Sequence, residues 1–290
     1  MFVGMTIHDA GRGLLFQLLH AYDEREAGNI ADWVMENITG WKKIDRVMNK
    51  AALLSEHQSS LLGKYTEQLL SHKPVQYVLH ESFFYGMKLY VDENVLIPRP
   101  ETEELVQWIL TDQKVNSIIN SPLILDIGTG SGCIGIAIKK NLAIGHVHAC
   151  DTSERALAVA QKNAIDQKTV IEFHQLNFLS EKEWDALSGF DIIASNPPYI
   201  PLKDKAEMSR VVLENEPHIA LFVENENPFL FYESIAKFAL RHLSKQGTIY
   251  VEIHESLGRE VQEIFSGKGF SRITIKKDMQ GKDRMVKAQW

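Results

Sequence analysis

A stiff loop in the middle of the chain holds the first residues that could do chemistry. The stretch "SNPPYIP" runs from Ser195 to Pro201 and follows "FDIIA", an apolar run that predicts a buried strand. Each proline fixes its own φ at about −65° and pushes the preceding residue toward extended backbone. Asn196 and Tyr199 are therefore held at fixed angles. The same pattern also fits a rigid turn with no chemical role. The neighbouring residues decide between a functional loop and such a turn.

A glycine pattern lies between a predicted strand and a predicted helix. "LDIGTGSG" contains Gly128, Gly130 and Gly132 after the acid Asp126. Glycines at such a turn let the backbone bend sharply and let a ligand lie against it. The next predicted strand ends on Asp151, and an acid at that position can accept hydrogen bonds from both ribose hydroxyls. Together these residues predict a site for a nucleoside.

The spacing of the glycines favours S-adenosylmethionine over NAD. A dinucleotide site reads G-x-G-x-x-G and places a pyrophosphate at the helix N-terminus, whereas this chain reads G-x-G-x-G with Asp126 in front. An acid beside the loop repels phosphate but attracts an ammonium group. Asn177 and Phe178 follow the third strand and are expected near the adenine, although Phe178 also suits an ordinary core position.

The predicted elements that position these residues alternate between strand and helix. Apolar runs predict strands at 122–128, 145–151, 169–174, 190–196, 247–253, 270–278 and 284–290. Helical periodicity is found at 132–141, 153–167, 228–244 and 256–269. This alternation predicts an α/β fold with a doubly wound, mostly parallel sheet and helices on both faces. Ligands bind such sheets beyond the carboxyl ends of the strands, which is where Asn196 lies.

The chain divides into three predicted parts. Residues 1–75 have the apolar periodicity of a small helical domain, residues 76–100 read as a β-hairpin-like connector, and residues 101–290 form the α/β domain. Arg99 is held between Pro98 and Pro100 at the junction. Pro100 and Glu101 also suit the first turn of a helix, so helix capping is the alternative explanation of this motif.

Bulk composition excludes several classes of protein. The 290 residues are 44% hydrophobic and 24% charged, with a net charge of −7, which disfavours a protein whose main task is to grip a polyanion. No apolar run approaches the roughly 20 residues of a membrane helix. Two cysteines, Cys133 and Cys150, indicate a reducing, cytoplasmic environment. No Cys/His cluster has metal-site spacing, so no metal is expected.

The stiff loop suits the methylation of a planar nitrogen. The lone pair of an amide or exocyclic amine is delocalised, so such a nitrogen is a poor nucleophile. The side-chain oxygen of Asn196 and the carbonyl of Pro197 are suitable acceptors for its two N–H groups, and Tyr199 offers a face for a planar group. The prolines keep these acceptors rigid, as catalysis by positioning requires.

In combination these motifs resemble class I S-adenosylmethionine-dependent amino-methyltransferases. "LIPRPETEELV", "NEPHIAL" and "GKDRMV", with "PVQY" and "FFYG", make nearly the whole chain similar to the protein-(glutamine) methyltransferases called PrmC or HemK. The resemblance implies a seven-stranded Rossmann-like methyltransferase sheet with an antiparallel last strand. It also implies that the chain methylates the Gln side chain of the Gly-Gly-Gln motif of class I peptide chain release factors, and that the N-terminal domain recognises this substrate.

The resemblance implies roles for individual residues. Cofactor contacts are expected at Asp126, Gly128, Thr129, Gly130, Ser131, Gly132, Asp151, Asn177, Phe178 and Asn196. Catalytic roles are expected for Asn196, Pro197 and Tyr199. Substrate contacts are expected at Arg99, Glu101, Asn196, Pro197, Pro198 and Tyr199. Two positions depart from the family pattern: Asn177 replaces a common acid, and His254 replaces a usual Gly.

Two other functions share part of this pattern. Adenine methyltransferases acting on DNA or RNA also carry N-P-P-Y. Such enzymes need a basic channel or a target-recognition domain to bind the nucleic acid, and the net negative charge of this chain disfavours that function. A catalytically idle scaffold would carry degraded loop residues, whereas these are intact. No direct nucleic-acid substrate is therefore expected.

Overall fold

The computed structural model describes residues 2–116, 120–225 and 227–290. The chain forms two compact units, Met1–Glu81 and Ser82–Trp290. The first unit thus extends beyond the boundary predicted at residue 75. The reason is a short helix that ends the unit, because its Val78 and Leu79 are buried in the same apolar core as the preceding helices.

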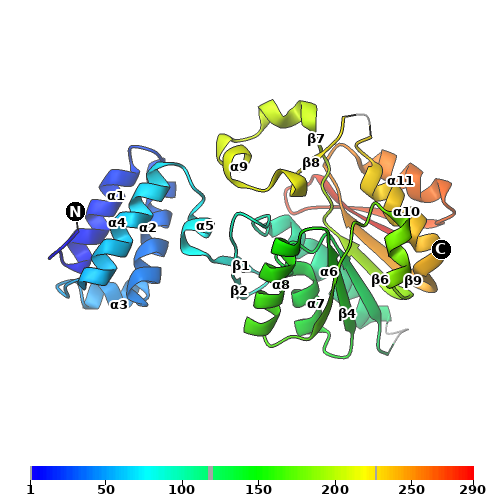
Figure 1. Ribbon diagram of the computed structural model, residues 1–290, viewed down its shortest axis with the longest axis horizontal. Helices are drawn as coiled ribbons and strands as arrows, with labels where there is room; N and C mark the ends of the chain where they lie inside the picture. The colour runs from blue at the N-terminus through cyan, green and yellow to red at the C-terminus, as the bar shows by residue number, and fades with distance from the viewer. Residues whose placement is uncertain (1, 117–119, 226) are drawn as a thin grey trace. The chain divides into compact units, whose positions relative to one another are not determined.

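The first unit is helical, as its periodicity predicts. Its helices are α1 (Ile7–Leu18), α2 (Glu24–Thr39), α3 (Lys43–Met48), α4 (Glu56–Leu70) and α5 (Val75–Leu79) (Figure 1). Side chains of Thr6, Asp23 and Ser55 accept hydrogen bonds from the first turns of α1, α2 and α4. Gly40 ends α2 with a φ of 70°, the left-handed conformation that glycine adopts readily.

The second unit opens with the hairpin that the connector sequence predicts. Strands β1 (Ser82–Phe84) and β2 (Met87–Leu89) pair antiparallel around Tyr85 and Gly86, whose φ values are 48° and 72°. Two residues with positive φ are the signature of a tight hairpin turn. An irregular segment then leads to helix α6 (Pro100–Asn116).

A seven-stranded sheet forms the centre of the second unit. Its strands are β3 (Leu123–Ile127), β4 (His146–Asp151), β5 (Ile171–Gln175), β6 (Phe190–Ser195), β9 (Leu243–Glu252), β10 (Arg272–Lys277) and β11 (Asp283–Gln289). The spatial order is β10-β11-β9-β6-β3-β4-β5. Strands β9, β6, β3, β4 and β5 are parallel, while β11 is antiparallel to both of its neighbours. The predicted sheet, including its antiparallel last strand, is confirmed.

Helices cover both faces of this sheet (Figure 1). The helices are α7 (Cys133–Asn141), α8 (Glu154–Asp166), α10 (Leu230–His242) and α11 (Gly258–Gly267), together with α6. Leu105 of α6 and Ile138 of α7 pack in one apolar core, and Phe238 of α10 and Phe265 of α11 pack in the other. Helix α10 was expected to reach Ser244 but ends at His242, because Leu243 already pairs with β6.

The segment between β6 and α10 has structure that the sequence pattern did not predict. It contains β7 (Ile200–Pro201), η2 (Leu202–Glu207), α9 (Arg210–Asn215), η3 (His218–Ala220) and β8 (Phe222–Val223), where η marks a 3₁₀-helix. Strands β7 and β8 pair in parallel.

Among the described residues, no helix is long and apolar enough to cross a membrane.

Asn163 on α8 connects the segment after the hairpin to the glycine loop. Its side chain is fully buried; Oδ1 accepts from Tyr90 N at 2.7 Å, and Nδ2 donates to the carbonyls of Tyr90 and Ser131, each at 2.9 Å. One amide thus satisfies three backbone groups from two segments. Because buried polar groups are costly to leave unpaired, we expect Asn163 to contribute strongly to the stability of this unit.

Replacing Asn163 with Ala should lower the free energy of unfolding by about 1–3 kcal/mol or more, the cost of leaving a buried polar group unsatisfied. Urea denaturation followed by circular dichroism measures this change. Asn141→Ala is the control, because Asn141 is exposed and, within the described part of the chain, its side chain bonds to Ala137 O of its own helix. It should change stability by less than about 0.5 kcal/mol. Equal losses for both variants would contradict the assigned role.

Candidate active site

A cavity of about 410 Å³ lies in the second unit, beyond the carboxyl ends of the parallel strands. Of the residues predicted to form the site, the following line it: Arg99, Gly128, Thr129, Gly130, Ser131, Asp151, Asn177, Phe178, Asn196 and Pro198. Glu101, Asp126, Gly132, Pro197 and Tyr199 are not part of the described lining, and their proposed ligand contacts stay predictions. The structure thus gathers residues from five separate motifs around one space.

The glycine loop is held against the end of β4. The backbone N–H groups of Gly128 and Thr129 both donate to Cys150 O, at 2.9 and 3.0 Å. Gly128, Gly130 and Gly132 all have positive φ values, which other residues adopt only with strain. At Gly132 a Cβ atom would also lie 2.9 Å from Ile136 Cδ1. The loop therefore needs glycine for its backbone shape and, at Gly132, for its close packing on α7.

Asp126 lies beneath this loop and anchors it. Its carboxylate is fully buried; Oδ2 accepts from Thr129 Oγ1 at 2.6 Å and from Gly135 N at 3.0 Å. Burial raises the pKa of this carboxyl to about 6, although the two hydrogen bonds act in the opposite direction. In the part of the chain that the structure describes, Oδ1 is buried without a hydrogen-bond partner. Because Asp126 is fully buried and outside the cavity lining, this atom has no described contact with the cavity.

Asp151 ends β4 with its carboxylate held from two sides. Oδ1 accepts from Ser153 N at 2.9 Å, and Oδ2 accepts from Gly130 N at 3.0 Å. Burial raises the pKa of this carboxyl, while the backbone N–H bonds lower it. A carboxylate oxygen accepts more than one hydrogen bond, so both oxygens can still accept from a ligand. The geometry suits a pair of adjacent hydroxyl groups.

The two predicted adenine contacts after β5 differ in exposure. Asn177 is exposed, and its Oδ1 accepts from Leu179 N at 3.1 Å, which leaves its amide N–H groups for a ligand. Phe178 is buried and packs against Trp184 and Phe238 with ring centroids 5.7 and 5.1 Å away. Phe178 therefore belongs to the apolar core and lines the cavity at the same time.

A hydrogen-bond network determines how the amide of Asn196 is oriented. Asn196 Nδ2 donates to Thr102 Oγ1 at 3.1 Å, and Thr102 Oγ1 donates to Glu252 Oε2 at 2.6 Å. A hydroxyl has only one proton, so a threonine that donates to a carboxylate must accept from Asn196. The N–H₂ end of the amide is thereby directed at Thr102. Asn196 Oδ1 is left as an acceptor beside the cavity.

Glu252 is a buried carboxylate at the end of β9. It is 2% exposed and accepts from Tyr199 Oη at 3.3 Å as well as from Thr102. Burial raises the pKa of this carboxyl to about 7, against the hydrogen bond from Thr102 and the positive charge of Arg284. Burial also raises the pKa of Tyr199. The phenol of Tyr199 is thus engaged with Glu252.

Arg99 forms an ion pair with the segment that precedes η3. Arg99 Nη2 lies 2.6 Å from Glu216 Oε1, and Glu216 Oε2 accepts from Ile97 N at 3.3 Å. The Glu216 side chain is 2% exposed and that of Arg99 is 33% exposed. The motifs "LIPRPETEELV" and "NEPHIAL" therefore meet at this pair. Arg99 also accepts from Thr102 N through its carbonyl at 3.1 Å, so it both caps α6 and lines the cavity.

Thr102, Glu216 and Glu252 were not identified as site residues from the sequence. Glu252 carried a usable signal, because a lone acid at the end of the apolar run "TIYVEI" needs a partner when it is buried. Thr102 carried no comparable signal, since a threonine in the first turn of a helix is ordinary. Thr102 is 94 residues from Asn196 and 150 residues from Glu252 in the chain, so no local sequence pattern could reveal these contacts.

Comparison with known proteins agrees with this geometry. The family models for the methyltransferase small domain and the PrmC N-terminal domain match residues 110–220 and 15–79. A release factor glutamine methyltransferase of Flavobacterium psychrophilum is 43% identical over 273 residues, 94% of this chain and 95% of that protein. The chain belongs to the release factor glutamine methyltransferase family. The predicted resemblance is confirmed, and the chain is a methyltransferase.

Further relatives support membership of this family. The release factor glutamine methyltransferase of Leptospira interrogans is 39% identical, covering 88% of each chain, and that of Lactococcus lactis is 38% identical, covering 88% of this chain and 92% of the relative. The solved hMettl16 catalytic domain in complex with MAT2A 3'UTR hairpin 6 has a TM-score of 0.55. It covers 84% of this chain and 85% of that chain at 14% identity, so the likeness concerns the fold alone.

Proposed function

We propose that this enzyme transfers a methyl group from S-adenosylmethionine to the side-chain amide nitrogen of the Gln in the Gly-Gly-Gln motif of class I peptide chain release factors. The observation that carries the proposal is the orientation of Asn196. Its Nδ2 is used by Thr102, so its oxygen is available to accept from an amide N–H beside the cavity. Membership of the family supports the same substrate.

The cavity suits S-adenosylmethionine. Its volume of about 410 Å³ lies in the usual range for small-molecule sites. Asp151 offers two fixed oxygens for the ribose hydroxyls, and the glycine loop lets a ligand lie against the backbone. Asp126 is buried beneath the loop and, with a pKa of about 6, adds negative charge there at neutral pH, which disfavours a phosphate and favours an ammonium group nearby. Asn177 and Phe178 provide a polar and an apolar contact for the adenine.

The chain's own residues act by positioning. When bound, S-adenosylmethionine supplies an electrophilic methyl group on a sulfonium, which is already a good leaving group. Asn196 Oδ1 and the carbonyl of Pro197 accept from the two N–H groups of the substrate amide and aim its nitrogen at that methyl group. The two prolines remove backbone freedom from this loop, so the acceptors need no reorganisation at the moment of transfer.

Thr102 and Glu252 act through Asn196 as positioning residues. The Glu252 carboxylate fixes the hydroxyl proton of Thr102, and Thr102 then fixes the amide of Asn196. Without this order the Asn196 amide could turn and present N–H groups to the substrate N–H groups. Such an arrangement would repel the substrate amide instead of orienting it.

The first unit is proposed to recognise the body of the release factor. A Gly-Gly-Gln tripeptide offers little surface, so most of the binding free energy must come from elsewhere. Helix α3 carries Ile44, Val47 and Met48 with 66%, 61% and 78% exposure. Exposed apolar side chains gathered on one short helix suit contact with a protein partner better than with a polyanion.

The function is tested by incubating the full-length enzyme with methyl-labelled S-adenosylmethionine and either a class I release factor or duplex DNA. We expect label on the release factor and a mass increase of one methyl group on its Gly-Gly-Gln peptide. A release factor whose motif Gln is replaced by Glu is the control and should stay unlabelled. Label on DNA but not on the release factor would identify an adenine methyltransferase instead.

Thr102→Val should lower the single-turnover rate on the order of 10²-fold, because a misplaced Asn196 no longer orients the amide. Thr102→Ser keeps the hydroxyl and should restore most of the rate. Thr111→Val on the same helix is the control, because Thr111 is exposed and its hydroxyl, as far as the described residues show, bonds to Gln107 one turn away. Rapid-quench measurement at saturating cofactor reads the effect. A wild-type rate for Thr102→Val would remove Thr102 from the mechanism.

The rate should also fall as the pH is lowered through about 7, where burial places the pKa of Glu252. Ionised Glu252, present above this pKa, accepts from Thr102. Protonated Glu252, present below it, donates to Thr102 instead, and Thr102 can then donate to the oxygen of Asn196. The acceptor for the substrate is lost in that state.

The pH dependence is measured as the single-turnover rate on both sides of pH 7 at saturating cofactor. Glu252→Gln is the matched variant, because it keeps the shape of the side chain and removes the titrating group. Its rate should be lower but should no longer fall on the acidic side. The same acidic fall in Glu252→Gln would assign the titration to another group.

A further inference from the structure

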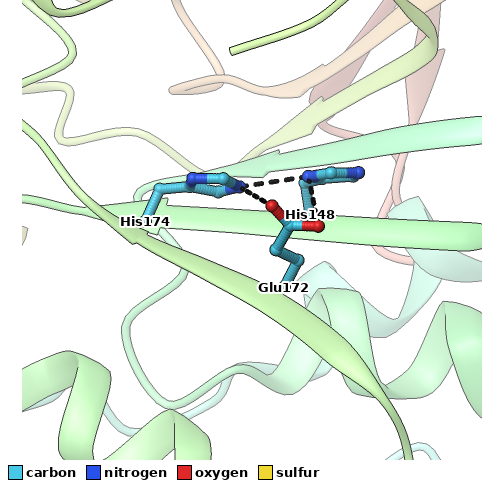
Figure 2. Close-up of side chains that lie close together, drawn as sticks. All are labelled: His148, Glu172 and His174. Atoms are coloured by element: carbon cyan, nitrogen blue, oxygen red, sulfur yellow. Dashed lines mark hydrogen bonds and ion pairs between the residues drawn. The ribbon is translucent and has the colours of Figure 1, made fainter. Parts of the chain in front are cut away.

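Three side chains on neighbouring strands converge outside the methyl-transfer cavity. His148 lies on β4, and Glu172 and His174 lie on β5 (Figure 2). The parallel register pairs His148 with Glu172, so both side chains leave the sheet on the same face. Residues two apart in a strand share a face, which adds His174 to the group. The sheet therefore brings all three side chains together.

The spacing of the three groups matches a metal-binding site. His148 Nδ1 and His174 Nε2 lie 3.0 Å apart. The Glu172 carboxylate lies next to both rings, with Oε2 at 3.7 Å from His148 Nδ1 and Oε1 at 3.5 Å from His174 Nε2. Ligand atoms held about 2.1 Å from a tetrahedral ion lie about 3.4 Å from one another. The three distances between ligand atoms, 3.0, 3.5 and 3.7 Å, are close to this separation of about 3.4 Å.

The surroundings hold the two rings and leave one side open. The side chains of His148 and His174 are only 15% and 17% exposed, whereas that of Glu172 is 65% exposed. The edge of the His148 ring also contacts Phe190, with centroids 5.4 Å apart. Figure 2 shows the two ring nitrogens facing each other and the Glu172 carboxylate next to both. Two preorganised imidazoles with one movable carboxylate make a site that solvent can reach from one side.

We propose that His148, Glu172 and His174 bind a divalent transition-metal ion, for which Zn²⁺ is the best match, with water in the remaining position. Two imidazole nitrogens and one carboxylate oxygen form a donor set that suits Zn²⁺, Co²⁺ and Ni²⁺ better than Mg²⁺ or Ca²⁺. In the metal-free chain one ring nitrogen donates a hydrogen bond to the other. A bound ion uses both lone pairs, so on binding that proton moves to the other nitrogen of its own ring and the two rings turn slightly.

The ion would connect the edge of the sheet to its interior. Strand β5 is the last strand of the sheet and pairs only with β4 within it. Asp151, which ends β4, and Leu176, which follows β5, line the methyl-transfer cavity. The ion is thus a structural clip that supports the cavity from behind and takes no part in the transfer of the methyl group.

The test uses the full-length enzyme after treatment with a chelator and dialysis. Calorimetric titration with Zn²⁺ should show one saturable site per chain, and Co²⁺ should give the visible absorption of a low-symmetry, nitrogen-ligated ion. His148→Ala and His174→Ala should weaken binding by more than the ~10- to 100-fold that loss of an outer-shell partner costs. Zn²⁺ should raise the melting temperature of the wild type but not of these variants.

Two further variants keep the proposal falsifiable. Glu172→Gln changes an exposed side chain and should weaken Zn²⁺ binding without disturbing the fold, even where a histidine variant is unstable. His57→Ala, at an exposed position on α4 in the other unit, is the control and should bind Zn²⁺ as the wild type does. Absence of saturable binding in the wild type overturns the proposal. So does wild-type affinity for Zn²⁺ in both His148→Ala and His174→Ala, since the two rings then share only a hydrogen bond.

Discussion

The buried carboxylate of Glu252 joins three segments of the second unit that are far apart in the sequence. It accepts from Thr102 at the start of α6 and from Tyr199 in the proline-rich loop, while its own carbonyl accepts from Tyr232 on α10 at 3.1 Å. A carboxylate with 2% exposure loses the solvation of water, so it must be surrounded by donors. These donors are the groups that hold the loop of Asn196 in place.

On the glycine-loop side of the cavity, buried acceptors around β3 and β4 hold the backbone in a similar way. The glycine loop donates to the carbonyl of Cys150 and to the carboxylate of Asp151, and Asp126 accepts from the loop below. Asn163 then bonds to the far end of the loop through Ser131. Buried hydrogen-bond acceptors thus fix the backbone of the glycine loop, which has few side chains of its own. The loop can therefore form a cavity wall without filling the cavity.

The fold was largely predictable because its signals are local. Alternation of apolar runs with helical periodicity predicted all seven strands of the sheet. The helix caps at Ser55 and Ser153 are local as well, because each side chain bonds to a backbone N–H three residues on. The segment from β7 to β8 was not predicted. Its elements are two to six residues long, which is too short for their sequence to show a clear period.

By itself the sequence determined the local chemistry of this protein: a strand-to-helix turn that only glycines allow, an acid at the next strand tip, and an asparagine held by prolines. Only the tertiary structure decided which groups face one another. Thr102 orients Asn196 across 94 residues, and Arg99 pairs with Glu216 across 117. His148 meets His174 because β4 and β5 pair in a particular register. Backbone conformation depends on nearest neighbours in the chain, whereas hydrogen-bond partners of buried side chains depend on the packing of distant elements.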